Sequence, residues 1–86
     1  MYRVELSRAA RQFFERSNVS LQRRLDRCFD QLKIDPRNAG SIKRLSGKLA
    51  DRYRYRVGDY RVIYRIDDQG ATVRVLKIAH RSEAYG

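Results

Sequence analysis

The chain of 86 residues contains no tryptophan and has one cysteine, one histidine and one proline. Because a lone cysteine, Cys28, cannot form an internal disulfide, we expect a reducing compartment such as the cytoplasm. One histidine and one cysteine are also too few to build a zinc site. No stretch approaches the roughly 18 apolar residues of a membrane span, and no apolar signal-peptide core follows Met1. We therefore expect a cytoplasmic protein with no cofactor, no metal and no membrane partner.

Acidic residues are scarce relative to basic ones. Ten Asp and Glu face twenty Lys and Arg, which gives a net charge of +10, and sixteen of the basic residues are arginine. The guanidinium group pairs with phosphate through two parallel hydrogen bonds, which lysine cannot do. Residues 42–65 hold eight basic and two acidic residues. Such a stripe is typical of nucleic-acid-binding proteins. We favour RNA over DNA as the partner, while an acidic protein or solubility alone would also explain the charge.

The first half of the chain is predicted to contain one strand and two helices. Residues 2–6 alternate between apolar and polar side chains, as in a short strand. Ser7 and Asn18 are plausible N-caps for two successive helices. The apolar residues of the second helix recur at one face of a 3.6-residue turn, and they are Leu21, Leu25, Cys28, Phe29 and Leu32. The residue before Pro36 is pushed out of the helical region, so the second helix ends there.

The second half carries a strong hairpin signal. Residues 52–57 alternate strictly, residues 60–66 follow as a second strand, and the two residues between them, Gly58-Asp59, favour a tight turn. A two-residue loop places Arg56 opposite Arg61, with tyrosine and valine on one face and arginine on the other. The helices should cover the apolar face. A like-charge pair across strands is destabilising, so the arginine face predicts an anion site, unless its side chains simply fan out into water.

The rest of the chain completes a single domain of residues 1–86. Residues 71–79 are apolar on both faces, which predicts a central strand. Residues 36–50 are predicted to form a basic connection without regular structure. The short polar segment 80–85 is expected to fold back over the sheet. The order is a strand, a helical hairpin and then three strands, which indicates the α+β class.

Three blocks carry a resemblance to a known family: LSGKL at 45–49, RVGDYRVIY at 56–64 and HRSEAY at 80–85. The chain resembles the RelE/ParE superfamily of bacterial toxins over essentially its whole length. The resemblance implies a four-stranded, mostly antiparallel sheet with both helices on one face. It implies the toxin of a type II toxin–antitoxin system, inhibited by a RelB-like antitoxin encoded beside it. RelE-type members cut mRNA in the ribosomal A site, whereas ParE-type members act on DNA gyrase.

The resemblance also implies an active site. The basic residues and the tyrosine of the RelE pattern fall on Arg54, Arg56, Arg61, Arg81 and Tyr85. We add His80 as a candidate base or acid, because arginine does not lose its proton near neutrality and histidine does. The alternative is a histidine packed at a strand end. The remaining basic residues of the stripe are candidate contacts to RNA or the ribosome, and they are Lys43, Arg44, Lys48, Arg52 and Arg65.

The expected function is therefore a metal-independent, ribosome-dependent endoribonuclease whose partners are the 70S ribosome and mRNA. The 2′-hydroxyl of the RNA would attack the neighbouring phosphorus, while arginines stabilise the charge that develops. Tyr85 could stack on a base. Two alternatives stay open: a gyrase inhibitor, and an inactive RNA-binding relative. The second is favoured by arginine at positions 54 and 56, where the best-known members have lysine.

Overall fold

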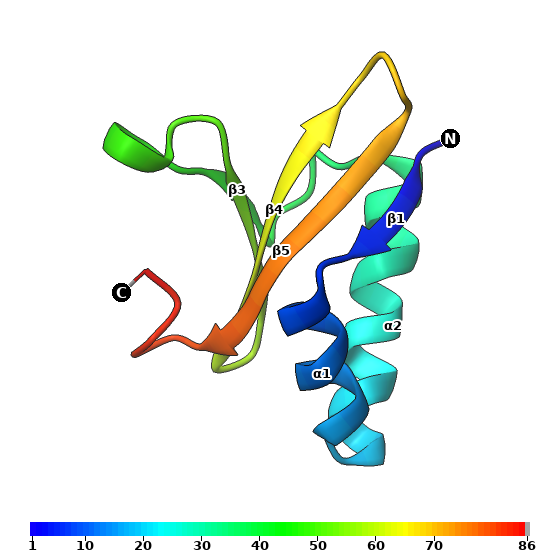
Figure 1. The fold of residues 1–86 in the computed structure, drawn as a ribbon, viewed down its shortest axis with the longest axis vertical. Helices are drawn as coiled ribbons and strands as arrows, with labels where there is room; N and C mark the ends of the chain where they lie inside the picture. Colours follow the sequence, from blue (N-terminus) through cyan, green and yellow to red (C-terminus); the bar gives the residue numbers. More distant parts are fainter. Residues whose placement is uncertain (86) are drawn as a thin grey trace.

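The structure is a computed structural model that describes residues 1–85 (Figure 1), so Gly86 of the predicted domain lies outside the described residues. In chain order the elements are β1 (Arg3–Leu6), α1 (Arg8–Arg16), α2 (Val19–Ile34), β2 (Ile42–Arg44), the 3₁₀ helix η1 (Gly47–Leu49), β3 (Tyr53–Val57), β4 (Tyr60–Asp67) and β5 (Thr72–His80). This order confirms the predicted α+β class.

The described strands form one sheet in the order β1-β5-β4-β3-β2. The β1–β5 pair is parallel and the other pairs are antiparallel. β5 is an interior strand between β1 and β4, in agreement with the prediction that it would not lie at an edge. The sheet has five strands and not four, because the expected connection at residues 36–50 contains β2 and η1. β2 has three residues and a single apolar side chain, Ile42, so it is too short to show a strand periodicity.

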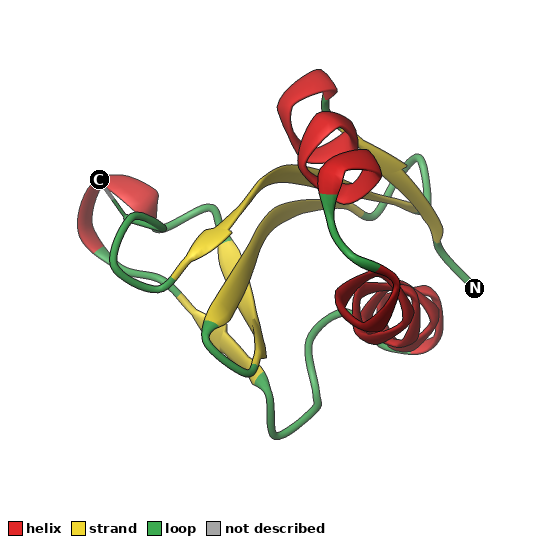
Figure 2. Cartoon of the chain, turned by 90° about the horizontal axis from the view of Figure 1, so that it is seen from below, coloured by secondary structure: helices red, strands yellow, loops and turns green. Residues whose placement is uncertain are grey.

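The two helices begin at the predicted caps. The Ser7 side chain accepts a hydrogen bond from the Ala10 N–H at 3.1 Å, and the Asn18 side chain accepts one from the Leu21 N–H at 2.8 Å. α2 ends at the residue before Asp35, as expected from the following proline. Both helices lie on one side of the sheet (Figure 2). The predicted apolar face of α2 is buried in the core, and its residues are Leu21, Leu25, Cys28, Phe29 and Leu32.

The hairpin has the predicted register. Val57 pairs with Tyr60 and Arg56 with Arg61. Gly58 lies in the left-handed region at φ 58°, where glycine meets no steric penalty. Between β4 and β5 the register shifts by one residue: Ile63 pairs with Lys77 and Tyr64 with Val75, so Leu76 is left over as a bulge.

The face of the sheet away from the helices is covered in part by the C-terminal segment. Ile63 and Ala79 lie on this face and are only 3% and 7% exposed. Ala84, in the segment after β5, is 5% exposed. The helices lie on the other side, whereas the C-terminal segment and the loop that carries η1 lie on this side of the sheet (Figures 1 and 2). The segment therefore folds back over the sheet, as predicted.

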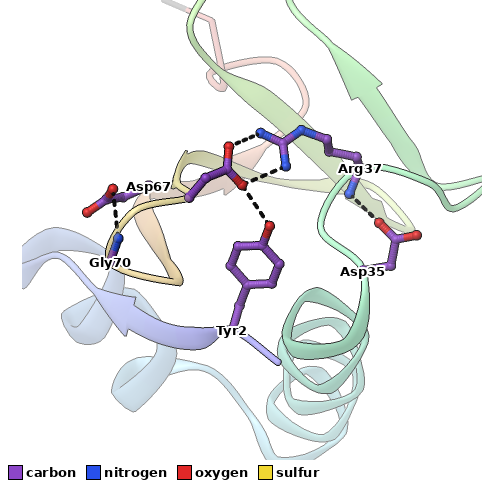
Figure 3. Close-up of polar contacts among 6 residues, drawn as sticks. Tyr2, Asp35, Arg37, Asp67 and Gly70 are labelled. Atoms are coloured by element: carbon purple, nitrogen blue, oxygen red, sulfur yellow. Dashed lines mark hydrogen bonds and ion pairs between the residues drawn. The ribbon is translucent and has the colours of Figure 1, made fainter.

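A polar cluster ties three segments together at the end of the sheet opposite the β3–β4 turn (Figure 3). Arg37 donates two hydrogen bonds to the Asp68 carboxylate at 3.0 and 2.8 Å, and the Tyr2 hydroxyl donates a third at 2.7 Å. The Arg37 guanidinium also lies over the Tyr53 ring, 5.9 Å from its centroid. The bonds from Arg37 and Tyr2 lower the pKa of Asp68. The cluster joins the start of β1, the connection after α2 and the β4–β5 turn.

Candidate functional site

A groove lies on the side of the sheet away from the helices. The loop that carries η1 and the C-terminal segment occupy this side together (Figures 1 and 2). The groove has a volume of about 420 Å³. Its lining is strongly basic and holds no acidic side chain; the lining residues are Lys43, Arg44, Leu45, Ser46, Arg54, Arg61, Arg81 and Tyr85. This composition suits a ligand with several negative charges.

Four of the six side chains predicted to be catalytic meet in this groove. Arg54 comes from β3 and Arg61 from β4, on the face that the hairpin register assigns to them. Arg81 follows β5 and is placed by its backbone N–H, which donates to the Asp59 carbonyl at 2.8 Å. Tyr85 lies at the rim and is 50% exposed. Residues up to 31 positions apart in sequence thus converge on one basic cavity.

The groove arginines are anchored on one side and free on the other. Arg54 donates from Nη1 to the Ser41 carbonyl at 2.8 Å. Arg61 donates from Nη1 to the Gly58 and Tyr60 carbonyls at 2.9 and 3.0 Å. Within residues 1–85 the Nε and Nη2 atoms of both arginines make no hydrogen bond, and neither guanidinium is ion-paired. The free Nε–Nη2 edge is the one that binds a phosphate through two parallel bonds.

The C-terminal segment is fastened by a residue that the sequence did not indicate. Lys77 of β5 donates from Nζ to the Glu83 carbonyl at 2.8 Å. The Glu83 N–H in turn donates to the His80 carbonyl at 2.8 Å. These bonds hold the segment that carries Arg81 and Tyr85. The signal in the sequence was a lysine in a mostly apolar strand. Its partner is a backbone carbonyl, which no residue type identifies in the sequence.

Arg56 lies outside the groove. Its Cα is opposite Arg61 as predicted, but Arg56 lines a separate cleft together with Arg24 and Arg27 of α2. Arg61 instead folds toward the carbonyls of its own turn. Arg56 and Arg61 therefore line different cavities, although they are opposite each other in the hairpin. The arginine face predicted from the sequence is thus divided between two cavities.

His80 also lies outside the groove. It pairs with Tyr60 and shares the helix-covered side of the sheet with it, and the two rings meet edge to face at 5.7 Å. The Nδ1 atom of the exposed imidazole accepts a hydrogen bond from the Ser82 N–H at 3.2 Å and lies 2.9 Å from the Ser82 hydroxyl. This position corresponds to the alternative weighed from the sequence, a histidine packed at a strand end.

The comparisons with known proteins agree with this arrangement. A family model described as the ParE toxin of the type II toxin–antitoxin system, parDE, matches residues 4–85. The chain belongs to the ParE toxin family. It is thereby a member of the RelE/ParE superfamily, as the resemblance implied.

Individual relatives of this ParE-family toxin are similar in sequence or in fold. Toxin RelG of Mycobacterium tuberculosis is 40% identical over 57 residues, which cover 66% of this chain and 63% of RelG. The RelBE2 toxin–antitoxin complex from the same organism matches with a TM-score of 0.80 and 30% identity, over 93% of this chain and 98% of the other. The archaeal RelE–RelB complex from Pyrococcus horikoshii matches with a TM-score of 0.81 and 29% identity, over 96% and 98%.

The five predicted RNA contacts of the toxin fall into three groups. Lys43 and Arg44 line the groove. Arg52 and Arg65 share one carboxylate, Asp51, at 3.7 and 3.3 Å, so part of the basic stripe is neutralised by an acid just before the hairpin. Lys48 lies exposed on η1. Of this set, the first pair has the placement needed to contact a ligand in the groove.

Two further observations concern the described part of the toxin. Among residues 1–85 no three His, Cys, Asp or Glu side chains are grouped as a metal site. In the same residues neither helix has the length and apolar character to cross a bilayer.

Proposed function

We propose that this toxin is an endoribonuclease that cleaves mRNA in the A site of the ribosome. The observation that carries the proposal is the groove in which Arg54, Arg61, Arg81 and Tyr85 meet. These residue types serve phosphodiester cleavage by positioning the substrate and stabilising charge. The likeness to toxin RelG and to the toxin of the RelBE2 complex supports the same assignment.

In the proposed reaction the 2′-hydroxyl oxygen of one nucleotide attacks the adjacent phosphorus and the bond to the 5′-oxygen breaks. The products are a 2′,3′-cyclic phosphate and a 5′-hydroxyl. Arg54 and Arg61 would bind the non-bridging oxygens through their free guanidinium edges, and Tyr85 would stack on a base. No side chain in the groove ordinarily titrates near neutrality. The groove therefore aligns the RNA and neutralises charge. The proton of the 2′-hydroxyl passes to the RNA, the ribosome or water, and the departing 5′-oxygen takes up a proton from the same sources.

The proposed partners follow from the charge and from the relatives. A toxin of net charge +10, acting in the cytoplasm, would be inhibited by a RelB-like antitoxin with an acidic segment. Two of the similar structures are complexes of a toxin with its antitoxin. Charge complementarity of this kind accelerates association, so we expect the on-rate to fall as salt is added.

Primer extension on mRNA from cells that express the toxin tests the proposal. The parent should give discrete cuts within translated codons. Arg61→Ala should abolish these cuts, whereas Arg23→Ala, which removes the same charge from an exposed position on α2, should retain them. Both variants should remain folded, because Arg23 is exposed and the half-buried Arg61 bonds only carbonyls of its own turn. If the folded Arg61→Ala variant still produces these cuts, the groove is not the site of cleavage.

The family model favours a second candidate, inhibition of DNA gyrase, because its description is that of ParE. The same cells distinguish the two functions. Double-strand DNA breaks and an SOS response, without cuts in mRNA, would identify gyrase as the target. An arginine groove of this kind is not required for gyrase inhibition, so toxicity should then survive Arg61→Ala.

A further inference from the structure

A second arginine cluster lies in the cleft between α2 and the end of β3. Arg24 and Arg27 are one turn apart on α2, and Arg56 of β3 lines the same cleft. The cleft has a volume of about 310 Å³, and no acidic side chain lines it. All three arginines are exposed, and within residues 1–85 none of them forms an ion pair. Three like charges therefore line one cavity without a counter-charge from the described part of the protein.

The cleft has a defined shape because of the β3–β4 turn. A Cβ atom at Gly58 would collide with the Arg24 guanidinium, so this charged group lies directly against the turn. The absence of a side chain at Gly58 is what leaves room for it. Arg24 is thereby placed against the turn that follows Arg56 by two residues, in the cavity that both arginines line. An arrangement that holds like charges together is expected where an anion binds.

We propose that this cleft binds a phosphate of an RNA backbone, as a second contact apart from the groove. The inference rests on the proposed RNA-directed function and deepens it. Arg54 in the groove and Arg56 in the cleft are two residues apart on β3, which is about 7 Å along an extended strand. In this proposal one polynucleotide contacts both cavities. The ligand-facing donors are guanidinium groups, which recognise phosphate in a bidentate manner.

The test uses a short single-stranded RNA with 2′-O-methyl groups, which binds but cannot be cleaved. Its affinity for the full chain is measured by fluorescence anisotropy over a range of salt concentrations. The double variant Arg24→Ala/Arg27→Ala is compared with Arg8→Ala/Arg23→Ala, which removes two exposed helical arginines outside both cavities. Thermal melts confirm that both variants are folded.

The expected result is a loss of about tenfold in affinity for the cleft variant beyond that of the control. The slope of log affinity against log salt should also decrease by about 0.7 for each phosphate contact removed. Repeating the measurement with purified 70S ribosomes distinguishes ribosomal RNA from the message as the source of the phosphate. Equal affinities and slopes for the two double variants would overturn the proposal.

The same assays distinguish two other outcomes, a protein-docking role of the cleft and a failure of the proposed nuclease function. If the cleft variant binds RNA like the control but binds an acidic antitoxin peptide more weakly, the cleft is a protein-docking site and the RNA proposal is wrong. Because the RNA probe cannot be cleaved, its binding does not depend on the nuclease activity. An absence of cuts in primer extension would refute the proposed function while the binding assay still reports on the cleft.

Discussion

Replacing Lys77 by methionine should weaken the groove without unfolding the sheet. Lys77 fastens the C-terminal segment through its bond to the Glu83 carbonyl at 2.8 Å. That segment supplies Arg81 and Tyr85 to the groove. Methionine retains most of the aliphatic stem, so the substitution removes the charged donor and little of the packing. We therefore expect a selective effect on the position of the segment.

The size of the effect follows from the environment of the bond. A hydrogen bond from a charged donor contributes about 1.5–3 kcal/mol when it is protected from water. This one is exposed, so about 1 kcal/mol is the appropriate value. The Arg81–Asp59 backbone bond and the burial of Ala84 still hold the segment. The expected result is an increase of about fivefold in KM for RNA, with a smaller change in kcat, since 1.4 kcal/mol corresponds to a factor of ten.

The assay is single-turnover cleavage on ribosomes programmed with a defined message, combined with ¹⁵N relaxation of the amides of Ala84 and Tyr85. Order in this segment should decrease in Lys77→Met and return in Lys77→Arg, which restores a charged donor. Lys33→Met is the matched control, because Lys33 is an exposed lysine with a partner, Asp30, at 3.6 Å. If Lys77→Met keeps the parent KM and the parent amide dynamics, this hydrogen bond does not position the segment.

Three further predictions concern single side chains. Tyr64 is fully buried and donates to the Pro36 carbonyl at 2.7 Å, so Tyr64→Phe should lower the free energy of unfolding by about 1–3 kcal/mol in chemical denaturation; an unchanged midpoint would mean that water replaces the hydroxyl. Arg37→Ala should raise the pKa of Asp68 toward its ordinary value in a carboxyl NMR titration, because Arg37 is the main cause of its lowering. A carboxyl whose pKa is lowered by folding stabilises the fold at pH values above its unfolded pKa of about 3.9. This stabilisation is lost as the pH falls through the folded pKa. The variant should therefore lose less stability than the parent on acidification. His80→Ala should change the cleavage rate less than about twofold. A loss within the 10²–10⁴-fold range typical of general acid–base groups would show that His80 acts as an acid or base in the reaction.

The features that the sequence predicted correctly are those set by short-range rules. A two-residue loop at Gly58-Asp59 fixes which residues of the hairpin are opposite, because strand side chains alternate with period two. Helix caps depend on side chains within three residues, so Ser7 and Asn18 were identifiable. The apolar face of α2 follows from the helical period. None of these predictions required knowledge of which segments meet in space.

The features that the sequence did not reveal depend on distant contacts. β2 exists because Ile42, Lys43 and Arg44 pair with β3, although three residues carry too little pattern to predict a strand. The division of the arginines between groove and cleft depends on how α2 packs beside Arg56. A period-two rule assigns a side chain to a face of the sheet, and it does not say which neighbouring element that side chain meets.

The bulge at Leu76 decides which of two adjacent residues belongs to the groove. Continuing the Tyr64–Val75 register without it would pair Arg61 with Ile78 and place His80 on the arginine face. The extra residue instead pairs Arg61 with Ala79, so the alternation turns His80 toward the helices and Arg81 toward the groove. Bulges are common beside active sites, where they redirect a side chain. One inserted residue thus brings Arg81 rather than His80 to the groove, which suits the charge stabilisation that we propose for this site.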